Sequence, residues 1–224
     1  MYPKTRLAWV MVGLAGALGI SGCRVSANFH EIDPGRYYRS AQLTKPELNL
    51  AIDTYGIKTI INLRGEDPKA SWFRDETQVA KDKGVTLINI PFSNSRLQHR
   101  RDLLKLLDSL RNAPRPILLH CRVGADRTGE ASVIYQMEYM GKSKEEALEM
   151  LTPKYHHIEL FVPTKRYFIQ ELYAGMDDAY ETYFPCKSNY KYYDKSKYCR
   201  DGEELPAALL PVEPEGEESP PPTG

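Results

Sequence analysis

The sequence lacks a net charge, an internal repeat and an apolar run that would comfortably cross a membrane. Its 30 basic residues are balanced by 30 acidic ones, so the overall charge gives no sign of a nucleic-acid partner. The apolar stretch at residues 7–20 is shorter than the about 20 residues that a transmembrane helix needs. His156 and His157 have no second pair of ligands at metal-binding spacing, so we expect them to cap or line a helix. The 224 residues suffice for one ordinary domain with appendages.

The N-terminus has the pattern of an export signal. Two basic residues precede the apolar stretch 7–20, which closes with Ile20-Ser21-Gly22-Cys23. This ending resembles the bacterial lipobox and implies that residues 1–22 are a signal peptide and that Cys23 is lipidated. The protein would then be tethered to a bacterial membrane at its periplasmic face, and Arg24 favours the outer membrane. The alternative is an ordinary cleaved signal with an incidental cysteine.

The charge balance hides an acidic C-terminal segment. Residues 201–224 hold seven acidic residues and no Lys or Arg. We expect this proline-rich tail to be disordered, because it cannot bury enough apolar surface to offset its ordering entropy. Without it and the first 23 residues, 28 basic and 23 acidic residues remain, and this mildly cationic domain suits an anionic substrate.

Strands alternate with helices along the middle of the chain. Apolar segments predict buried strands at 58–63, 85–91 and 116–120, and the tyrosine-rich segment 36–42 predicts a short one. Apolar periodicity and capping patterns predict helices at 44–56, 72–83, 101–111, 128–140, 143–151 and 164–175. Such alternation indicates an α/β fold with a mostly parallel, doubly wound sheet flanked by helices. We expect one domain at 36–200, with residues 23–35 as an irregular linker.

The segment from His120 to Gly129 carries the chemistry. It reads HCRVGADRTG and runs off the end of an apolar strand into a helix. A small, glycine-containing loop at such a junction directs backbone N–H groups into one concavity, and the helix terminus adds positive potential, so a phosphate dianion fits there. A thiol in this place ionises readily, which makes Cys121 a candidate nucleophile. The planar guanidinium of Arg127 would hold two phosphoryl oxygens.

This segment resembles the His-Cys-x5-Arg-Ser/Thr-Gly signature of the protein-tyrosine / dual-specificity phosphatase superfamily at every fixed position. The resemblance extends from about Tyr37 to Leu151 through the stretches YRSAQ and GIKTIINLR, and implies a dual-specificity-phosphatase-like fold. It also implies a phosphocysteine intermediate on Cys121, Thr128 assisting departure of the thiolate, and no metal or other cofactor. The loop amides would bind the phosphate, including those of Arg122, Val123, Gly124 and Ala125. The alternative is a structural cysteine at a strand end.

One part of the family pattern is missing. Members carry an aspartate general acid about 30 residues before the nucleophile, where this chain reads Phe-Ser-Asn-Ser at 92–95. Asp126 is the best substitute, because a bound phosphate dianion beside it would favour the protonated carboxyl group. Alternatively, Asp126 bonds the loop backbone or orients Arg127. Glu66 and Asp67 are more distant candidates.

Two cysteines remain once Cys23 and Cys121 have separate roles. Cys186 and Cys199 flank a loop with little apolar content, and an exported protein meets an oxidising compartment, so a disulfide between them is expected. The alternative is two unpaired thiols.

These observations predict a lipid-anchored phosphomonoesterase whose default substrate is a phosphotyrosine protein. An inositol phosphate or phospholipid headgroup is the alternative substrate, although phosphoinositide enzymes of the superfamily usually have further basic residues in the loop where this chain has Ala125. A non-catalytic phosphate-binding lipoprotein is a second alternative. The expected partners are a phosphorylated protein or small phosphomonoester and, through the anchor, a membrane.

Metabolic labelling with palmitate tests the anchor. The wild type should carry label and the Cys23→Ser variant should not, because acylation needs that thiol. A labelled variant, or an unlabelled wild type, would contradict the lipoprotein interpretation.

Overall fold

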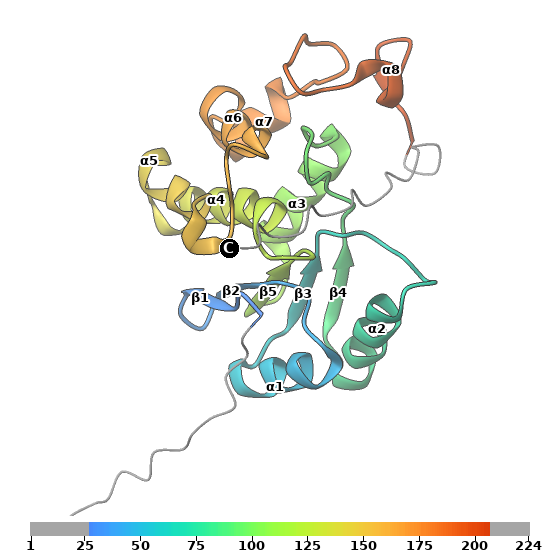
Figure 1. The fold of residues 1–224 in the computed structure, drawn as a ribbon, viewed down its shortest axis with the longest axis vertical. Helices are drawn as coiled ribbons and strands as arrows, with labels where there is room; N and C mark the ends of the chain where they lie inside the picture. Colours follow the sequence, from blue (N-terminus) through green and yellow to red (C-terminus); the bar gives the residue numbers. More distant parts are fainter. Residues whose placement is uncertain (1–26, 207–224) are drawn as a thin grey trace, which may run out of the picture.

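The fold is described from a computed structural model, which covers residues 27–206. The expected signal peptide, Cys23 and the tail beyond residue 206 lie outside the described residues. The main sheet has five strands in the order β1-β2-β5-β3-β4, which run across Figure 1. Their bounds are β1 His30–Asp33, β2 Tyr37–Ser40, β3 Thr59–Asn62, β4 Thr86–Asn89 and β5 Ile117–His120. β1 pairs antiparallel with β2, and the other neighbours are parallel, so the predicted mostly parallel sheet is confirmed.

The central strands are buried on both faces because apolar side chains alternate between two cores. In β2, β3 and β5 all four positions are buried. Ile61 and Leu119 pack in the cluster that includes α3 and α4 residues. Their neighbours Ile60 and Leu118 point the other way and pack in the cluster under α1 and α2. This two-sided burial explains why these segments read as continuous apolar runs.

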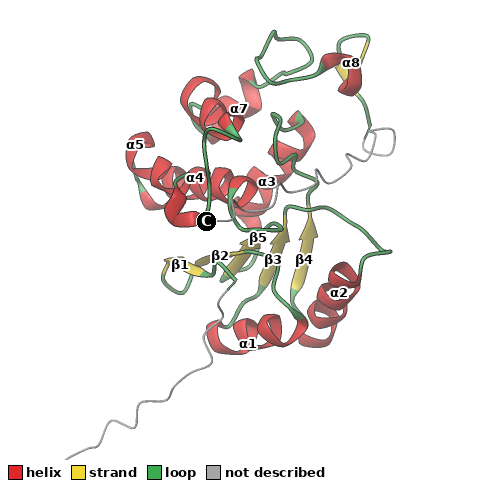
Figure 2. Ribbon diagram, in the orientation of Figure 1, coloured by secondary structure: helices red, strands yellow, loops and turns green. Residues whose placement is uncertain are grey.

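Helices cover both faces of the sheet, as Figure 2 shows. The helices α1 (Lys45–Tyr55) and α2 (Ser71–Lys83) lie on one face. On the other lie α3 (Arg100–Asn112), α4 (Asp126–Met140), α5 (Lys144–Ala147) and α6 (Pro163–Tyr167). Turns of 3-10 helix occupy Leu148–Met150 and Pro153–Tyr155, and a π turn, Phe168–Leu172, extends α6. No helix within residues 27–206 is long and apolar enough to span a membrane.

Two expectations about the ends of the domain were wrong. The segment 28–35, expected to be irregular, contains β1, a four-residue edge strand too short and too exposed to show a clear alternation. The tail, expected to start at residue 201, is ordered as far as strand β7 (Glu203–Glu204), which pairs with β6 (Cys199–Arg200). Glu204 accepts a hydrogen bond from the backbone N–H of Arg101, 3.2 Å away in the first turn of α3. A carboxylate is favoured at a helix N-terminus, which explains this ordering.

The C-terminal part of the domain packs around aromatic side chains. It contains α7 (Met176–Thr182) and α8 (Lys195–Tyr198), which the sequence did not predict because both are short. Cys186 and Cys199, the pair expected from the cysteine count, have Cα atoms 5.7 Å apart and are joined by a disulfide. Tyr183 and Tyr198, close to these cysteines in the sequence, are buried and replace the apolar side chains that the segment lacks.

Candidate active site

The loop 121–125 begins at the carboxyl end of β5 and ends at the first turn of α4. β5 lies between β2 and β3, so the loop sits at the middle of the sheet edge. Open parallel sheets bind ligands at this edge. The predicted strand-loop-helix junction around Cys121 is therefore confirmed, and α4 directs its N-terminus at the loop.

Donors from outside the loop hold its carbonyl groups. The backbone N–H of Gln42 donates to the carbonyl of Arg122 across 3.1 Å. Asn28 Nδ2 donates to the carbonyls of Val123, 3.2 Å away, and Gly124, 3.0 Å away. A peptide group whose carbonyl is held on one side directs its N–H to the other, so these contacts turn the loop amides inward. The inward N–H of Gly124 lies 3.3 Å from Cys121 Sγ.

Gly124 is the residue that this geometry requires. Its φ is +75°, in the left-handed region. A Cβ atom there would lie 2.7 Å from the backbone nitrogen of Ala41 and 2.8 Å from the carbonyl carbon of Ser40. The loop therefore packs directly on the end of β2, with no space for a side chain.

Arg39 holds the loop from the side of β2. It belongs to β2, is fully buried, and donates from Nη2 to the Gly124 carbonyl and from Nη1 to the Met150 carbonyl, 3.2 Å away. Its guanidinium carbon lies 4.5 Å from the centre of the Tyr155 ring. Burial lowers the pKa of Arg39, whereas the nearby Cys121 raises it. A buried cation thus stands directly behind the candidate nucleophile.

Cys121 is a buried free cysteine with a thiol that is easily ionised. Burial alone would raise its pKa, but the pKa is lowered below the ordinary value because stabilising contacts outweigh burial. These are the charge of Arg127, hydrogen bonds from the hydroxyl and N–H of Thr128, and the N–H of Gly124. The Thr128 hydroxyl is buried and makes no other hydrogen bond in the described part of the chain. The residues predicted to act together are therefore brought together.

Arg127 is held by the ends of two other strands. Its Nη1 donates to the carbonyls of Leu63, 3.3 Å away, and Phe92, 3.5 Å away. These residues follow β3 and β4 respectively. The guanidinium is thereby fixed at the sheet edge on the side of Cys121, with its remaining donors available for phosphoryl oxygens.

A buried ion pair adjoins the nucleophile on the other side. His120 Nε2 lies 2.8 Å from Glu76 Oε1, and both side chains are buried. Burial alone would lower the pKa of His120, but the carboxylate of Glu76 raises it above the ordinary value. Gln42 also donates to Glu76, across 3.1 Å. The imidazolium stabilises negative charge on Cys121, and Gln42 links the pair to the loop.

The structure gives Asp126 a partner that neither alternative from the sequence included. Its Oδ1 lies 2.6 Å from Nδ1 of His157, rather than against the loop backbone or Arg127. The His157 side chain is fully buried, whereas that of Asp126 is 26% exposed. The expectation that His156 and His157 cap or line a helix is confirmed, because His156 caps the 3-10 turn Pro153–Tyr155 and the His157 imidazole lies at the start of α4.

The segment 92–95, where relatives carry the general acid, is firmly held. Lys165 Nζ donates to the Ser93 carbonyl across 2.7 Å, and the Ser93 N–H donates to Gln98 Oε1 across 2.8 Å. Lys165 and Gln98 in turn bond Glu130 Oε2, at 3.0 and 2.8 Å. Glu66 and Asp67 are exposed on the loop after β3. Among the candidate acids, Asp126 is the one that directly follows the loop, as the first residue of α4.

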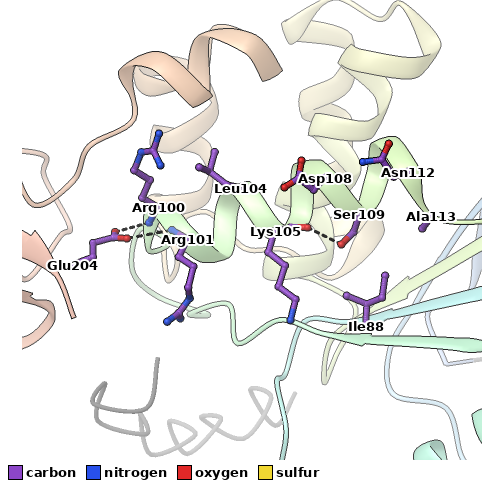
Figure 3. A pocket seen from close by; sticks show the side chains of 10 residues that line it. All are labelled: Ile88, Arg100, Arg101, Leu104, Lys105, Asp108, Ser109, Asn112, Ala113 and Glu204. Atoms are coloured by element: carbon purple, nitrogen blue, oxygen red, sulfur yellow. Dashed lines mark hydrogen bonds between the residues drawn. The ribbon is translucent and has the colours of Figure 1, made fainter. Parts of the chain in front are cut away.

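One hollow in the described part of the chain lies away from this loop. It measures about 710 Å³ and runs along α3 (Figure 3). Its cations are already engaged: Arg101 pairs with Asp102 at 2.7 Å, and Lys105 donates to the Asn89 carbonyl at 2.8 Å. Within residues 27–206 no group of three or more His, Cys, Asp or Glu residues is placed to hold a metal ion.

The supporting residues that were missed in the sequence include Asn28, Arg39, Glu76 and His157. Arg39 had a signal, because an arginine inside the short apolar strand YYRS is costly unless it is bonded. Glu76 also had one, since it lies on the apolar face of α2. Asn28 and His157 had none, because their contacts with the loop are set by tertiary packing.

Comparison with known proteins points to one family. A family model described as a DSP-PTPase phosphatase fused to NAD+ kinase matches residues 25–160. Two curated relatives are the dual specificity protein phosphatase TpbA from Pseudomonas aeruginosa strains UCBPP-PA14 and PAO1, each 28% identical. The matches cover 55% and 65% of this chain and 53% and 72% of the relatives, so the chain spans about half the length of the first.

Solved structures show a similar fold. P. aeruginosa TpbA in complex with pTyr has a TM-score of 0.56 at 22% identity, over 70% of this chain and 91% of that one. The core catalytic domain of the PP-IP phosphatase SIW14 from S. cerevisiae, in complex with citrate, has a TM-score of 0.52 at 22% identity, over 69% and 88%. These likenesses confirm the fold expected from the signature segment.

Alkylation by iodoacetamide tests the electrostatics of the loop. In a Cys23→Ser background, with the disulfide intact, Cys121 is the single thiol. Because its pKa is lowered, the alkylation rate should reach half its maximum at a lower pH in the folded protein than in urea. Arg127→Met should raise that midpoint, since it removes the largest favourable contribution. Equal midpoints in folded and unfolded protein would contradict this account of the loop.

Proposed function

The chain belongs to the DSP-PTPase phosphatase family, and from that premise we propose that it hydrolyses phosphomonoesters through a phosphocysteine intermediate on Cys121. The observation that carries the proposal is a thiol of lowered pKa in a loop of inward amides. Cys121 has a lowered pKa, and the carbonyls of Arg122, Val123 and Gly124 are bonded on the outer side. Such a loop binds a phosphate dianion directly in front of the sulfur.

In the first step, Cys121 Sγ attacks phosphorus in line with the ester oxygen. The S–P bond forms as the P–O bond breaks, and Asp126 gives its proton to the departing oxygen. Arg127 and the loop amides bind the three remaining oxygens and stabilise their charge in the transition state. The products of this step are an alcohol or phenol and a phosphocysteine.

In the second step, water attacks the phosphocysteine. The Asp126 carboxylate takes a proton from that water, and the S–P bond breaks to release inorganic phosphate. The Thr128 hydroxyl, which has no other partner within residues 27–206, stabilises the departing thiolate by donating to Sγ. Cys121 and Asp126 then return to their starting protonation states.

Phosphotyrosine on protein is the substrate that the observations support best. The curated relatives are named dual specificity protein phosphatases, and TpbA has been solved with pTyr. Three large apolar side chains follow directly after His157, the partner of Asp126: Ile158, Leu160 and Phe161 are 47%, 85% and 73% exposed. Exposed apolar side chains at this point of the chain suit an aromatic ring and its peptide neighbours. The proposed lipid anchor on Cys23 would place this site at a membrane.

An inositol phosphate is the second candidate substrate. It is supported by the fold shared with SIW14, described as a PP-IP phosphatase. Such substrates carry several phosphates and need several cations, but the loop supplies only Arg122 and Arg127, with Ala125 between them. This difference in charge favours the phosphotyrosine substrate.

Replacement of the nucleophile tests the mechanism. Cys121→Ser should abolish hydrolysis of an aryl phosphate yet still bind vanadate, because a hydroxyl is a poor nucleophile at neutral pH while the loop persists. The wild type should be assayed on phosphotyrosine peptides, inositol phosphates and phospholipids. Undiminished turnover by the variant would refute the mechanism, and a preference for inositol phosphates would overturn the substrate proposal.

Replacement of Asp126 tests the general acid. A proton donor matters most when the leaving oxygen is basic, so Asp126→Asn should slow tyrosyl or alkyl phosphates by about 100-fold or more. Nitrophenyl phosphate, whose leaving group departs without help, should remain much closer to the wild-type rate. An equal loss with both substrates would show that Asp126 serves only the shape of the loop.

A further inference from the structure

His157 is a buried titratable residue in contact with the loop and has no role in the steps above. Its Nδ1 lies 2.6 Å from Asp126 Oδ1, so one proton lies between the two atoms. Its Nε2 is buried and has no hydrogen-bond partner in the described residues. Asp126 Oδ2 makes no hydrogen bond there either, although its side chain is 26% exposed.

The unpartnered Nε2 determines which nitrogen carries the proton. An N–H buried without an acceptor costs more than a bare ring nitrogen, and a buried imidazolium would have such an N–H. The imidazole is therefore neutral, with its hydrogen on Nδ1. That hydrogen is donated to Asp126 Oδ1, and this leaves Oδ2 as the oxygen that carries or loses the acid proton.

The backbone around His157 fixes the ring in this place. The preceding 3-10 turn ends at His156, whose left-handed φ of 66° turns the chain back toward the loop. The His157 N–H donates to the Thr152 carbonyl across 3.1 Å. The Tyr155 carbonyl accepts from Asn28 Nδ2, the group that also bonds the loop carbonyls. Segment 152–157 and the loop are thus one connected unit.

We propose that His157 is the positioning residue of the general acid: its Nδ1–H holds Asp126 Oδ1 and directs the acid proton to Oδ2. When Oδ2 gives that proton to the departing oxygen, the same N–H stabilises the carboxylate that forms. When the carboxylate takes a proton from the attacking water, the original state returns. His157 keeps its own proton throughout. This inference rests on the proposed function, because it needs Asp126 to be the acid.

The contribution of His157 should depend on the leaving group. A hydrogen bond to a charged group that forms during the reaction accelerates it by about ten- to a hundredfold. His157→Leu, which removes the donor and keeps an apolar side chain in the buried site, should lower kcat by this factor for tyrosyl phosphates. It should lower kcat much less for nitrophenyl phosphate.

Two further variants separate the donor from the packing of the ring. The Asn amide nitrogen stands at the position of Nδ1, whereas the Gln amide nitrogen reaches the position of Nε2. His157→Asn should therefore keep most of the activity on tyrosyl phosphates, and His157→Gln should lose it. His156→Asn is the matched control, since His156 is exposed and Asn tolerates its left-handed backbone.

The experiment measures kcat for a series of aryl phosphates with increasingly basic leaving groups. The enzymes compared are the His157 variants, Asp126→Asn, and the double variant that combines Asp126→Asn with His157→Leu. We expect no further loss when His157→Leu is added to Asp126→Asn, because the two act through one proton. If His157→Leu slows all substrates equally, or if the losses in the double variant multiply, the proposal is wrong. If His157→Leu does not fold, the Asn and Gln variants give the same comparison, and equal activity of these two would overturn it.

The proposed function can be refuted separately from the role of His157. An active Cys121→Ser variant refutes the thiolate mechanism, and an Asp126→Asn variant that slows all substrates equally refutes the general acid. When both of those tests succeed, a flat leaving-group dependence in the His157 variants refutes the role of His157 alone.

Discussion

The outward orientation of three loop carbonyls is the constraint on which the candidate site depends. Five residues can surround a phosphate only if their N–H groups converge, and converging N–H groups leave the carbonyls in need of donors elsewhere. Here the donors come from three places: Asn28 before the sheet, Arg39 in β2 and the N–H of Gln42 just after it. The segment expected to be a linker therefore helps to hold the loop through Asn28.

Three cationic side chains surround Cys121 at different depths in the protein. Arg127 lies at the exposed side, His120 flanks the nucleophile from within the protein, and Arg39 stands behind the loop. Each buried cation would be costly alone. Glu76 offsets the cost for His120, and carbonyl oxygens with the Tyr155 ring offset it for Arg39. Together these cations favour both a thiolate and a phosphate at the loop.

The sequence predicted those structural features that are determined by residues adjacent in the chain. The strands predicted at 58–63, 85–91 and 116–120 and the helix predicted at 128–140 are local patterns, and all four elements are present, with shorter strands and a helix that begins two residues earlier. Contacts set by tertiary packing were not predictable. Asp126 and His157 are 31 residues apart and meet through a 3-10 turn and one left-handed residue, for which a single sequence gives no periodicity. The short elements α7, α8 and β7 were missed because packing and a disulfide stabilise them, rather than local propensity.

The hydrogen bonds that hold residues 93–98 have a consequence for the kinetics of the proposed reaction. Where a catalytic acid lies on a separate lid, each turnover includes an opening and a closing, and these motions often limit the rate. Here Ser93 is bound to Gln98 and Lys165, which bind the buried Glu130 in α4, the helix that carries Arg127. An acid on the phosphate loop itself moves with the nucleophile, not with a lid. In the proposed mechanism, substrate entry and product escape would then be separated from the assembly of the catalytic groups, and diffusion of substrate to the loop would replace closure as the step before chemistry.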